Sequence, residues 1–261
     1  MYDLAALDAA LTGTLFSGKL HFAPVTGSTN TDALEAARAG APHGSVYFAD
    51  EQNAGRGRGD HRWQSDSGQG LYVSVLLRLP LTAERLPLLP LAVGLAAAAA
   101  MQQASGLTAD LRWPNDLLLG ERKAGGILVE SKLDGAALAY AVAGIGINVH
   151  QRAFNLHLAT PATSLDLAVG RAVSRQHLLV CLLKSLEREA HALQDATALE
   201  AIPARVEAAS TWMRGRVVDV HGPQACTGVT AGLDAHGFLR VQTTEGVVTV
   251  QTGGIRAIKA G

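Results

Sequence analysis

The chain has 261 residues, 48% of them hydrophobic, which is enough for one large domain or one domain with a small appendage. A formal net charge of −1 argues against a general nucleic-acid binder, because such proteins carry a basic excess. The two cysteines, Cys181 and Cys226, form no CxxC motif, so neither a disulfide framework nor a structural zinc site is expected.

No basic stretch followed by an apolar run opens the chain, so we expect no signal peptide. The longest uncharged run, residues 86–109, contains two prolines and two glutamines. That composition predicts a buried helix rather than a membrane span. We therefore expect a cytoplasmic protein without membrane contact.

The first half of the chain alternates helical and extended patterns. A cluster of helix-capping residue types occupies 28–32, and Thr29 and Asp32 have the spacing of a capping box. The predicted elements are a partly helical segment over 1–20, a helix over about 32–39, strands over 46–49 and 71–79, and an alanine-rich helix over 91–104.

Short strands dominate the second half. Turn signals at 120–122 and 134–135 predict an antiparallel meander, and the glycine-bearing strands after Trp212 predict a small β-barrel that needs support from the first domain. The predicted elements are strands over 107–113, 117–119, 124–131 and 137–149, helices over 175–196 and 201–212, and strands over 217–220, 227–233, 238–243 and 247–252.

The most informative stretch is the run over 55–63, Gly-Arg-Gly-Arg-Gly-Asp-His-Arg-Trp. Glycine lets backbone amides approach an anion, and arginine offers a planar fork of donors. We expect this loop to be mobile without ligand and to close over an anion. Taken alone, it is equally compatible with a solvated turn or with non-specific RNA contact.

Four further patterns accompany this run. They are Ser-Thr-Asn at 28–30, Arg-Trp-Pro-Asn-Asp at 112–116, Lys-Ala-Gly-Gly-Ile-Leu-Val-Glu at 123–130, and Gly-Ile-Gly-Ile-Asn at 144–148. In this order the five patterns closely resemble the signature of the biotin–protein ligases. Any one of them is modest evidence, whereas five in order are highly specific.

The resemblance implies an α/β (α+β) fold: a class II synthetase-like catalytic domain with a mixed, largely antiparallel sheet over 1–213, and an SH3-like barrel over 214–261. It implies that ATP and Mg²⁺ activate biotin as biotinyl-5′-AMP. The biotin would then pass to a lysine of a biotin carboxyl carrier protein, that of acetyl-CoA carboxylase being the usual one. Adenylation needs concentrated positive charge but no covalent nucleophile of the enzyme.

The resemblance also assigns roles to residues of this chain. It places Lys123 and Arg58 in catalysis. Biotin contacts are expected from Ser28, Thr29, Asn30, Gln52, Gly55, Arg56, Gly57, Arg58, Lys123, Gly126 and Gly144. ATP contacts are expected from Arg58, Arg62, Trp63, Arg112, Trp113, Asn115, Asp116, Lys123 and Asn148.

Each assignment has a simpler interpretation. Ser28 and Thr29 have the types of ordinary helix caps, and a lone Trp-Pro-Asn-Asp ends many strands. Lys123 is of a type that is usually solvated, and Trp63 is of a type that usually packs in a core. Glycine weakens a strand, so glycines at 126, 144 and 146 indicate close approach of a ligand or of another backbone.

The chain departs from the family pattern in three places. Asp60 and His61 stand where many relatives have glycine and arginine, so we leave His61 out of the site and ask whether Arg62 replaces the arginine. Arg112 stands where many have lysine. Only 27 residues precede Ser28, too few for the DNA-binding domain of the repressor forms, so we expect a single-function enzyme, either monomer or homodimer.

Three alternatives remain. A lipoate or octanoate ligase would share the fold and the lysine. A biotin or nucleotide sensor would bind without catalysing, although the full set of charged residues argues against it. An RNA-binding protein would be expected to show a basic excess and interleaved aromatic residues.

Overall fold

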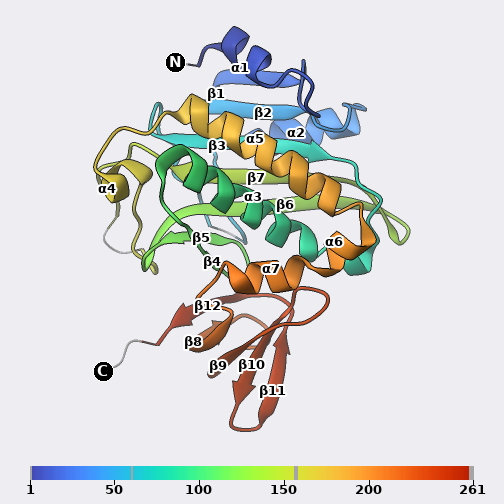
Figure 1. Cartoon of the computed structure of the whole chain (residues 1–261), viewed down its shortest axis with the longest axis vertical. Helices are drawn as coiled ribbons and strands as arrows, with labels where there is room; N and C mark the ends of the chain where they lie inside the picture. Colours follow the sequence, from blue (N-terminus) through green and yellow to red (C-terminus); the bar gives the residue numbers. More distant parts are fainter. Residues whose placement is uncertain (1, 60, 156–157, 259–261) are drawn as a thin grey trace.

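A computed structural model describes residues 2–59, 61–155 and 158–258. Its larger part is built on a seven-stranded sheet with the order β1-β2-β3-β7-β6-β5-β4 (Figure 1). β1 pairs with β2 in parallel and the other neighbours pair antiparallel, which confirms the mixed, largely antiparallel sheet. The strands are β1 (Leu20–Thr26), β2 (Val46–Gln52), β3 (Gly70–Leu77), β4 (Asp110–Arg112), β5 (Asp116–Leu119), β6 (Arg122–Asp134) and β7 (Ala137–Asn148).

The predicted meander is confirmed in this sheet. β5, β6 and β7 follow one another as antiparallel neighbours. Gly120 and Gly135 form their turns with φ of +59°, a left-handed conformation that glycine adopts without steric penalty. β3 and β7 lie at the centre, and all eight residues of β3 are buried. The motif over 144–148 therefore lies on a central strand, beside the motif over 123–130 on β6.

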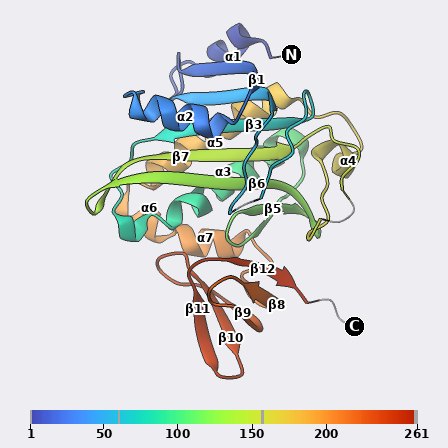
Figure 2. The same cartoon turned by 180° about the vertical axis from the view of Figure 1, so that it is seen from behind.

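Helices cover both faces of the sheet. α3 (Leu88–Ser105) and α5 (Arg175–Ala192) pack on one face, and α2 (Thr29–Arg38) lies on the other (Figures 1 and 2). The alanines of α3 allow close packing, and 11 of its residues are buried. The remaining helical elements are α1 (Leu4–Ala10), the 3₁₀ turn η1 (Ala83–Arg85), α4 (Leu165–Val169), α6 (Ala196–Glu200) and α7 (Ile202–Ala208).

In the described part of the chain, α3 is the one helix that is long and apolar enough to cross a membrane. However, 67% of it is buried inside the fold, which confirms the prediction of a core helix. It ends at Gly106, whose φ of +82° provides a left-handed cap.

The N-terminal boundaries differ from prediction. Residues 4–10 are helical, whereas 20–26 form the unpredicted strand β1. β1 lies at the sheet edge with an irregular burial pattern and contains Pro24, so alternation could not reveal it. α2 begins at Thr29 rather than at about Asp32. The Thr29 N–H donates to Oε1 of Gln52, the last residue of β2, and this contact stabilises the first turn of the helix. The capping-box prediction was wrong, since Asp32 accepts from Thr26 Oγ1 instead.

Smaller differences occur at other boundaries. The predicted strand over 107–113 is limited to β4, because it pairs only through the three residues opposite β5. α5 ends at Ala192, four residues before the predicted end at 196, and a separate helix, α6, begins at Ala196 with Asp195 as its N-cap. α7 ends at Ala208, four residues before the predicted end.

The last part of the chain forms a second, antiparallel sheet with the order β11-β10-β9-β8-β12, seen below α7 in Figure 1. Trp113 Nε1 donates to the Gly237 carbonyl (3.1 Å) and the Leu233 N–H donates to Glu207 Oε1 (2.6 Å), which ties this sheet to the larger unit. The predicted short strands are confirmed and β12 is added. They are β8 (Arg214–His221), β9 (Cys226–Leu233), β10 (Leu239–Thr243), β11 (Gly246–Val250) and β12 (Gly254–Ala257).

Candidate active site

A cavity of about 620 Å³ lies between the seven-stranded sheet, the loop over 55–63 and the β8–β12 side of the second sheet. Every site residue proposed from the sequence lines it, with the exception of Gly55. Gly55 is buried beside it, and a Cβ there would lie 2.4 Å from the Trp63 carbonyl oxygen. Folding therefore gathers motifs from five separate stretches of sequence around one space.

The N-terminus of α2 forms one end of the cavity. Gln52 Oε1 accepts from the Thr29 N–H (2.9 Å), and Gln52 Nε2 donates to Ser65 Oγ (2.8 Å). Ser28, Thr29 and Asn30 are each 4% exposed. This end offers neutral hydroxyl and amide groups in a largely dry setting, which suits a polar but uncharged ligand group.

Arg56 of the loop is held by a carboxylate. Its guanidinium forms a bidentate pair with Glu130 on β6, with distances of 2.9 and 2.6 Å. The same carboxylate accepts from Asn30 Nδ2 (2.9 Å). Glu130 closes the motif over 123–130, and the motif assigned it no role; a single charge directly after the apolar run at 127–129 was the available signal.

Arg58 reaches across the cavity to the second sheet. Its Nη1 donates to the Gly253 carbonyl (2.8 Å) and lies 3.4 Å from Asn115 Oδ1. Burial lowers the pKa of Arg58, an effect that the charge of Asp116 opposes. The guanidinium stays charged at neutral pH. Opening the loop requires that this contact and the Arg56–Glu130 pair both break.

The second sheet contributes residues that the sequence prediction missed. His221 and residues 252–256 line the cavity. Gly253 has φ of +116°, and a Cβ there would lie 2.1 Å from the His221 carbonyl oxygen, so only glycine suits this position. Burial and the charge of Arg256 lower the pKa of His221. The glycine pair at 253–254 was the available signal.

Asp116 joins two cations at the other end of the cavity. Its Oδ1 lies 2.5 Å from Lys123 Nζ, and its Oδ2 lies 2.5 Å from Arg112 Nη2. Burial alone would raise the pKa of Asp116, but the charges of Lys123 and Arg112 outweigh burial and lower it. This end therefore concentrates positive charge around one carboxylate, a setting suited to phosphate.

The lowered pKa of Asp116 makes stability depend on pH. At pH values above the pKa of an Asp in the unfolded chain, about 3.9, the charge of Asp116 contributes its full stability. This stability is lost as the pH falls through the lower pKa of the folded state. As the pH is lowered below about 4, we expect the free energy of unfolding of wild type, measured in urea, to decrease. The decrease is expected to be less steep for Asp116→Asn. Asp8→Asn, at an exposed position of α1, is the control. Equal slopes for wild type and Asp116→Asn would contradict this expectation.

Trp63 lies across two strand glycines on the cavity floor. A Cβ on Gly146 would lie 2.6 Å from Trp63 Nε1, and one on Gly126 would lie 3.2 Å from Trp63 Cζ3. Lys123 Nζ lies 5.5 Å from the ring centroid. The indole N–H is buried and has no hydrogen-bond partner among the described residues. The close approach expected at the glycines is thus made here by a side chain.

Gly144 accommodates Asn30 in the same way, since a Cβ there would lie 2.0 Å from Asn30 Oδ1. We expect Gly144→Ala to lower the free energy of unfolding in urea by about 1–3 kcal/mol. Gly94→Ala, in α3, is the control, because its nearest neighbours lie at 3.5 and 3.6 Å. That change is expected to be neutral or to stabilise by about 0.5–1 kcal/mol. Equal unfolding free energies for the two variants would refute this explanation.

Two other predicted site residues, Asn148 and Trp113, donate hydrogen bonds to backbone carbonyls. Asn148 Nδ2 donates to the Thr163 carbonyl (3.0 Å), although the residue lines the cavity. Trp113 is 3% exposed and donates to Gly237, as a core aromatic does. His61 and Arg62 are exposed and line the cavity, whereas Asp60 lies outside the described residues.

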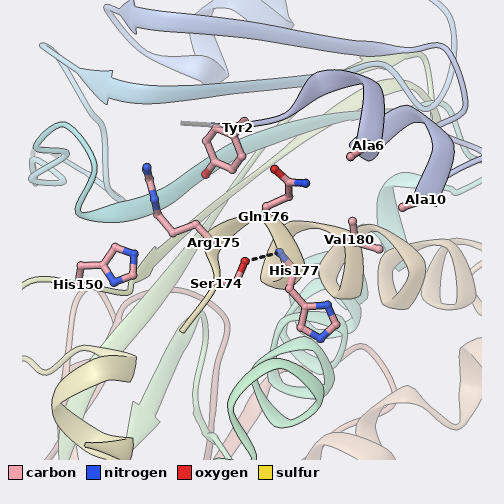
Figure 3. A pocket seen from close by; sticks show the side chains of 9 residues that line it. All are labelled: Tyr2, Ala6, Ala10, His150, Ser174, Arg175, Gln176, His177 and Val180. Carbon is pink, nitrogen blue, oxygen red and sulfur yellow. Dashed lines mark hydrogen bonds between the residues drawn. The ribbon is translucent and has the colours of Figure 1, made fainter. Parts of the chain in front are cut away.

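A second cavity of about 620 Å³ lies at the N-terminus of α5 (Figure 3). Two of its polar side chains already have partners: Arg175 pairs with Asp50 (2.7 Å), and His150 Nδ1 lies 2.8 Å from Asp166 Oδ2. None of the quoted motifs lines it. Within 2–59, 61–155 and 158–258, no cluster of three or more His, Cys, Asp or Glu residues could hold a metal ion.

The chain is similar in sequence to known biotin ligases. The model of the biotin/lipoate A/B protein ligase family matches residues 22–148. The bifunctional ligase/repressor BirA of Bacillus subtilis is 33% identical over 239 residues, which cover 88% of this chain and 71% of that protein. The biotin–[acetyl-CoA-carboxylase] ligase of Mycobacterium tuberculosis is 33% identical over 237 residues, covering 88% and 85%.

A solved structure is similar over nearly the whole chain. It is the biotin protein ligase from Aquifex aeolicus in complex with biotin and ATP, with a TM-score of 0.77 and 28% identity. The match covers 93% of this chain and 100% of that one. The chain belongs to the biotin protein ligase family and is a ligase that forms an amide bond.

Proposed function

We propose that this protein activates biotin with ATP and transfers the biotinyl group to a lysine of a biotin carboxyl carrier protein. The observation that carries the proposal is a single cavity with two chemically different ends. The neutral end at Thr29 and Gln52 suits the ureido ring of biotin, and the cationic end at Lys123 and Arg112 suits the phosphates of ATP.

The site residues divide between these ends. The proposed catalytic residues are Lys123, beside Asp116, and Arg58, whose Nη1 lies 3.4 Å from Asn115 Oδ1. The proposed biotin contacts are Ser28, Thr29, Asn30, Gln52, Gly55, Arg56, Gly57, Arg58, Lys123, Gly126 and Gly144. The proposed ATP contacts are Arg58, Arg62, Trp63, Arg112, Trp113, Asn115, Asp116, Lys123 and Asn148.

The chemistry takes two steps. A biotin carboxylate oxygen attacks the α-phosphorus of ATP, and pyrophosphate leaves, giving biotinyl-5′-AMP. The neutral ε-amine of the carrier lysine then attacks the acyl carbon, the C–O bond to AMP breaks, and the nitrogen releases one proton to solvent as the amide forms. Because two anions meet in the first step, the charges of Lys123 and Arg58 stabilise the transition state. A closed loop over 55–63 excludes water from the labile anhydride.

The residues present fit a Mg²⁺ ion that arrives with the nucleotide. Asp116 offers carboxylate oxygens at the cationic end, while phosphates and water can complete the shell, as is usual for this ion. The bound ion would neutralise phosphate charge. Lys123 and Arg112 hold the Asp116 carboxylate in place.

The partner and the domain arrangement complete the proposal. Relatives named as biotin–[acetyl-CoA-carboxylase] ligases support the carrier of that carboxylase as the partner. We assign 1–213 to the catalytic domain and 214–261 to an SH3-like barrel. The five-stranded antiparallel sheet supports the barrel.

ATP–pyrophosphate exchange with Mg²⁺, compared among biotin, lipoate and octanoate, tests the function. We expect exchange with biotin alone. Exchange with lipoate or octanoate would instead place the protein among the lipoate ligases, which the same family model includes. Biotin binding without exchange would indicate a sensor. Transfer is then measured as acylation of a carrier protein.

A further inference from the structure

We infer that Ser74 is a positioning residue for the biotin end of the cavity and acts through Thr29 and Asn30. This role rests on the proposed function, since it concerns how that end holds its acid. Ser74 lies in the middle of β3, has no exposed surface and sits behind the residues that line the cavity. No sequence motif included it. A hydroxyl buried in an otherwise apolar strand costs free energy unless it is hydrogen-bonded.

The orientation of the Asn30 amide follows from its partners. Nδ2 donates to the Glu130 carboxylate (2.9 Å) and lies 3.3 Å from the Leu128 carbonyl oxygen. Both partners can only accept, so the amide nitrogen faces them and Oδ1 faces Ser74. Ser74 Oγ therefore donates its single proton to Asn30 Oδ1, at 2.5 Å.

This donation fixes the direction of the hydrogen bond between Thr29 and Ser74. Thr29 Oγ1 lies 2.7 Å from Ser74 Oγ, and because the Ser74 proton is already used, Thr29 is the donor of the pair. Gln52 Oε1, at 3.1 Å, is the competing acceptor and already accepts from the Thr29 N–H. Ser74 thus holds the Thr29 hydroxyl in one orientation, with its remaining lone pairs available to a ligand.

The same chain of hydrogen bonds extends to the loop. Asn30 shares Glu130 with Arg56, so Ser74 is connected through Asn30 to a loop arginine. Without the Ser74 hydroxyl, the Thr29 proton can turn to Gln52, and Asn30 Oδ1 loses its donor. Both effects fall on the neutral end of the cavity, whereas among the residues that the structure describes Asp116 and Lys123, at the other end, share no hydrogen-bond partner with Ser74.

Ser74→Ala tests this role in ATP–pyrophosphate exchange. We expect the KM for biotin to rise by roughly tenfold, the loss typical of one buried hydrogen bond, while kcat and the KM for ATP change by less than about twofold. Ser45→Ala is the matched control: Ser45 is equally buried and donates to the Pro42 carbonyl (2.8 Å), outside the cavity. It is expected to leave both KM values unchanged. Thermal unfolding of both variants measures the stability cost.

Two further variants sharpen the test. Ser74→Cys keeps the size with a weaker donor and is expected to give an intermediate KM for biotin. Thr29→Val combined with Ser74→Ala is expected to raise this KM by less than the product of the single effects, because Ser74 acts partly through Thr29.

An unchanged KM for biotin in Ser74→Ala would overturn the inference, as would equal increases for biotin and ATP, which would indicate a general structural role. If Ser74→Ala fails to fold, Ser74→Cys is judged by the same criteria. If none of biotin, lipoate and octanoate supports pyrophosphate exchange by the wild-type protein, the proposed function is refuted and this role with it. If wild type exchanges pyrophosphate with biotin and Ser74→Ala has the same KM for biotin, this role alone is refuted.

Discussion

Replacing Lys123 with alanine is expected to slow biotin-dependent ATP–pyrophosphate exchange by about 10²–10³-fold, the loss typical when one preorganised donor is removed from a reacting anion. Lys123 Nζ lies at the cationic end, 2.5 Å from Asp116, and over the Trp63 ring. Its removal leaves Asp116 with Arg112 as its remaining close cation and takes positive charge from the α-phosphate. The kcat for exchange at saturating biotin and ATP measures the effect.

Lys132→Ala is the control for Lys123, because Lys132 lies on the same strand but is exposed at its far end. We expect its exchange rate to match that of wild type. Lys123→Arg should recover only part of the activity, since it restores the charge with a different geometry. Near-normal turnover of Lys123→Ala would exclude the proposed catalytic role.

Replacing Arg58 with glycine is expected to let biotinyl-5′-AMP escape, raising its dissociation rate by about 10–100-fold. That range corresponds to the loss of charge-assisted hydrogen bonds. In the structure Arg58 spans the cavity, from the loop to the Gly253 carbonyl of the second sheet. A glycine in its place also makes the loop more flexible, so closure costs more entropy.

The release of biotinyl-5′-AMP can be followed by stopped flow or by non-enzymatic labelling of a bystander protein. Arg152→Gly, at an exposed loop position, is the control and is expected to retain the intermediate as wild type does. If Arg58→Gly holds the intermediate as tightly as wild type, loop closure through Arg58 is disproved. The predicted mobility of the loop can be measured by hydrogen exchange with and without biotin.

Local pattern predicted most of the secondary structure, because apolar periodicity and turn glycines act over a few residues. The meander over β5–β7 and the buried helix α3 are examples. Two of the failures, at β1 and at the start of α2, occur where contacts from elsewhere in the chain set the structure. β1 is an edge strand with irregular burial, and the start of α2 is capped by Gln52 from another strand, so neither depends on its own neighbours in sequence.

The candidate residues of the site were also readable, because five motifs in order resemble the signature of one family, and that resemblance assigns a role to each residue. Of the residues assigned in this way, all but Gly55 line one cavity. The signal was the order of five motifs rather than any single one, since Asn30, Asp116 and Trp63 each have an ordinary structural use.

The partners that those side chains take were beyond the reach of the sequence. Asn30 and Glu130 are 100 positions apart, and Arg58 and Gly253 are 195 apart, so only packing brings them together. Ser74 looks like a polar interruption of an apolar strand until its proton is traced to Asn30. Motifs and composition therefore identify the family and the chemistry that these groups can perform. Long-range contacts alone establish which of them line the cavity and which hold the others in place, because hydrogen-bond direction depends on acceptors distant in the chain.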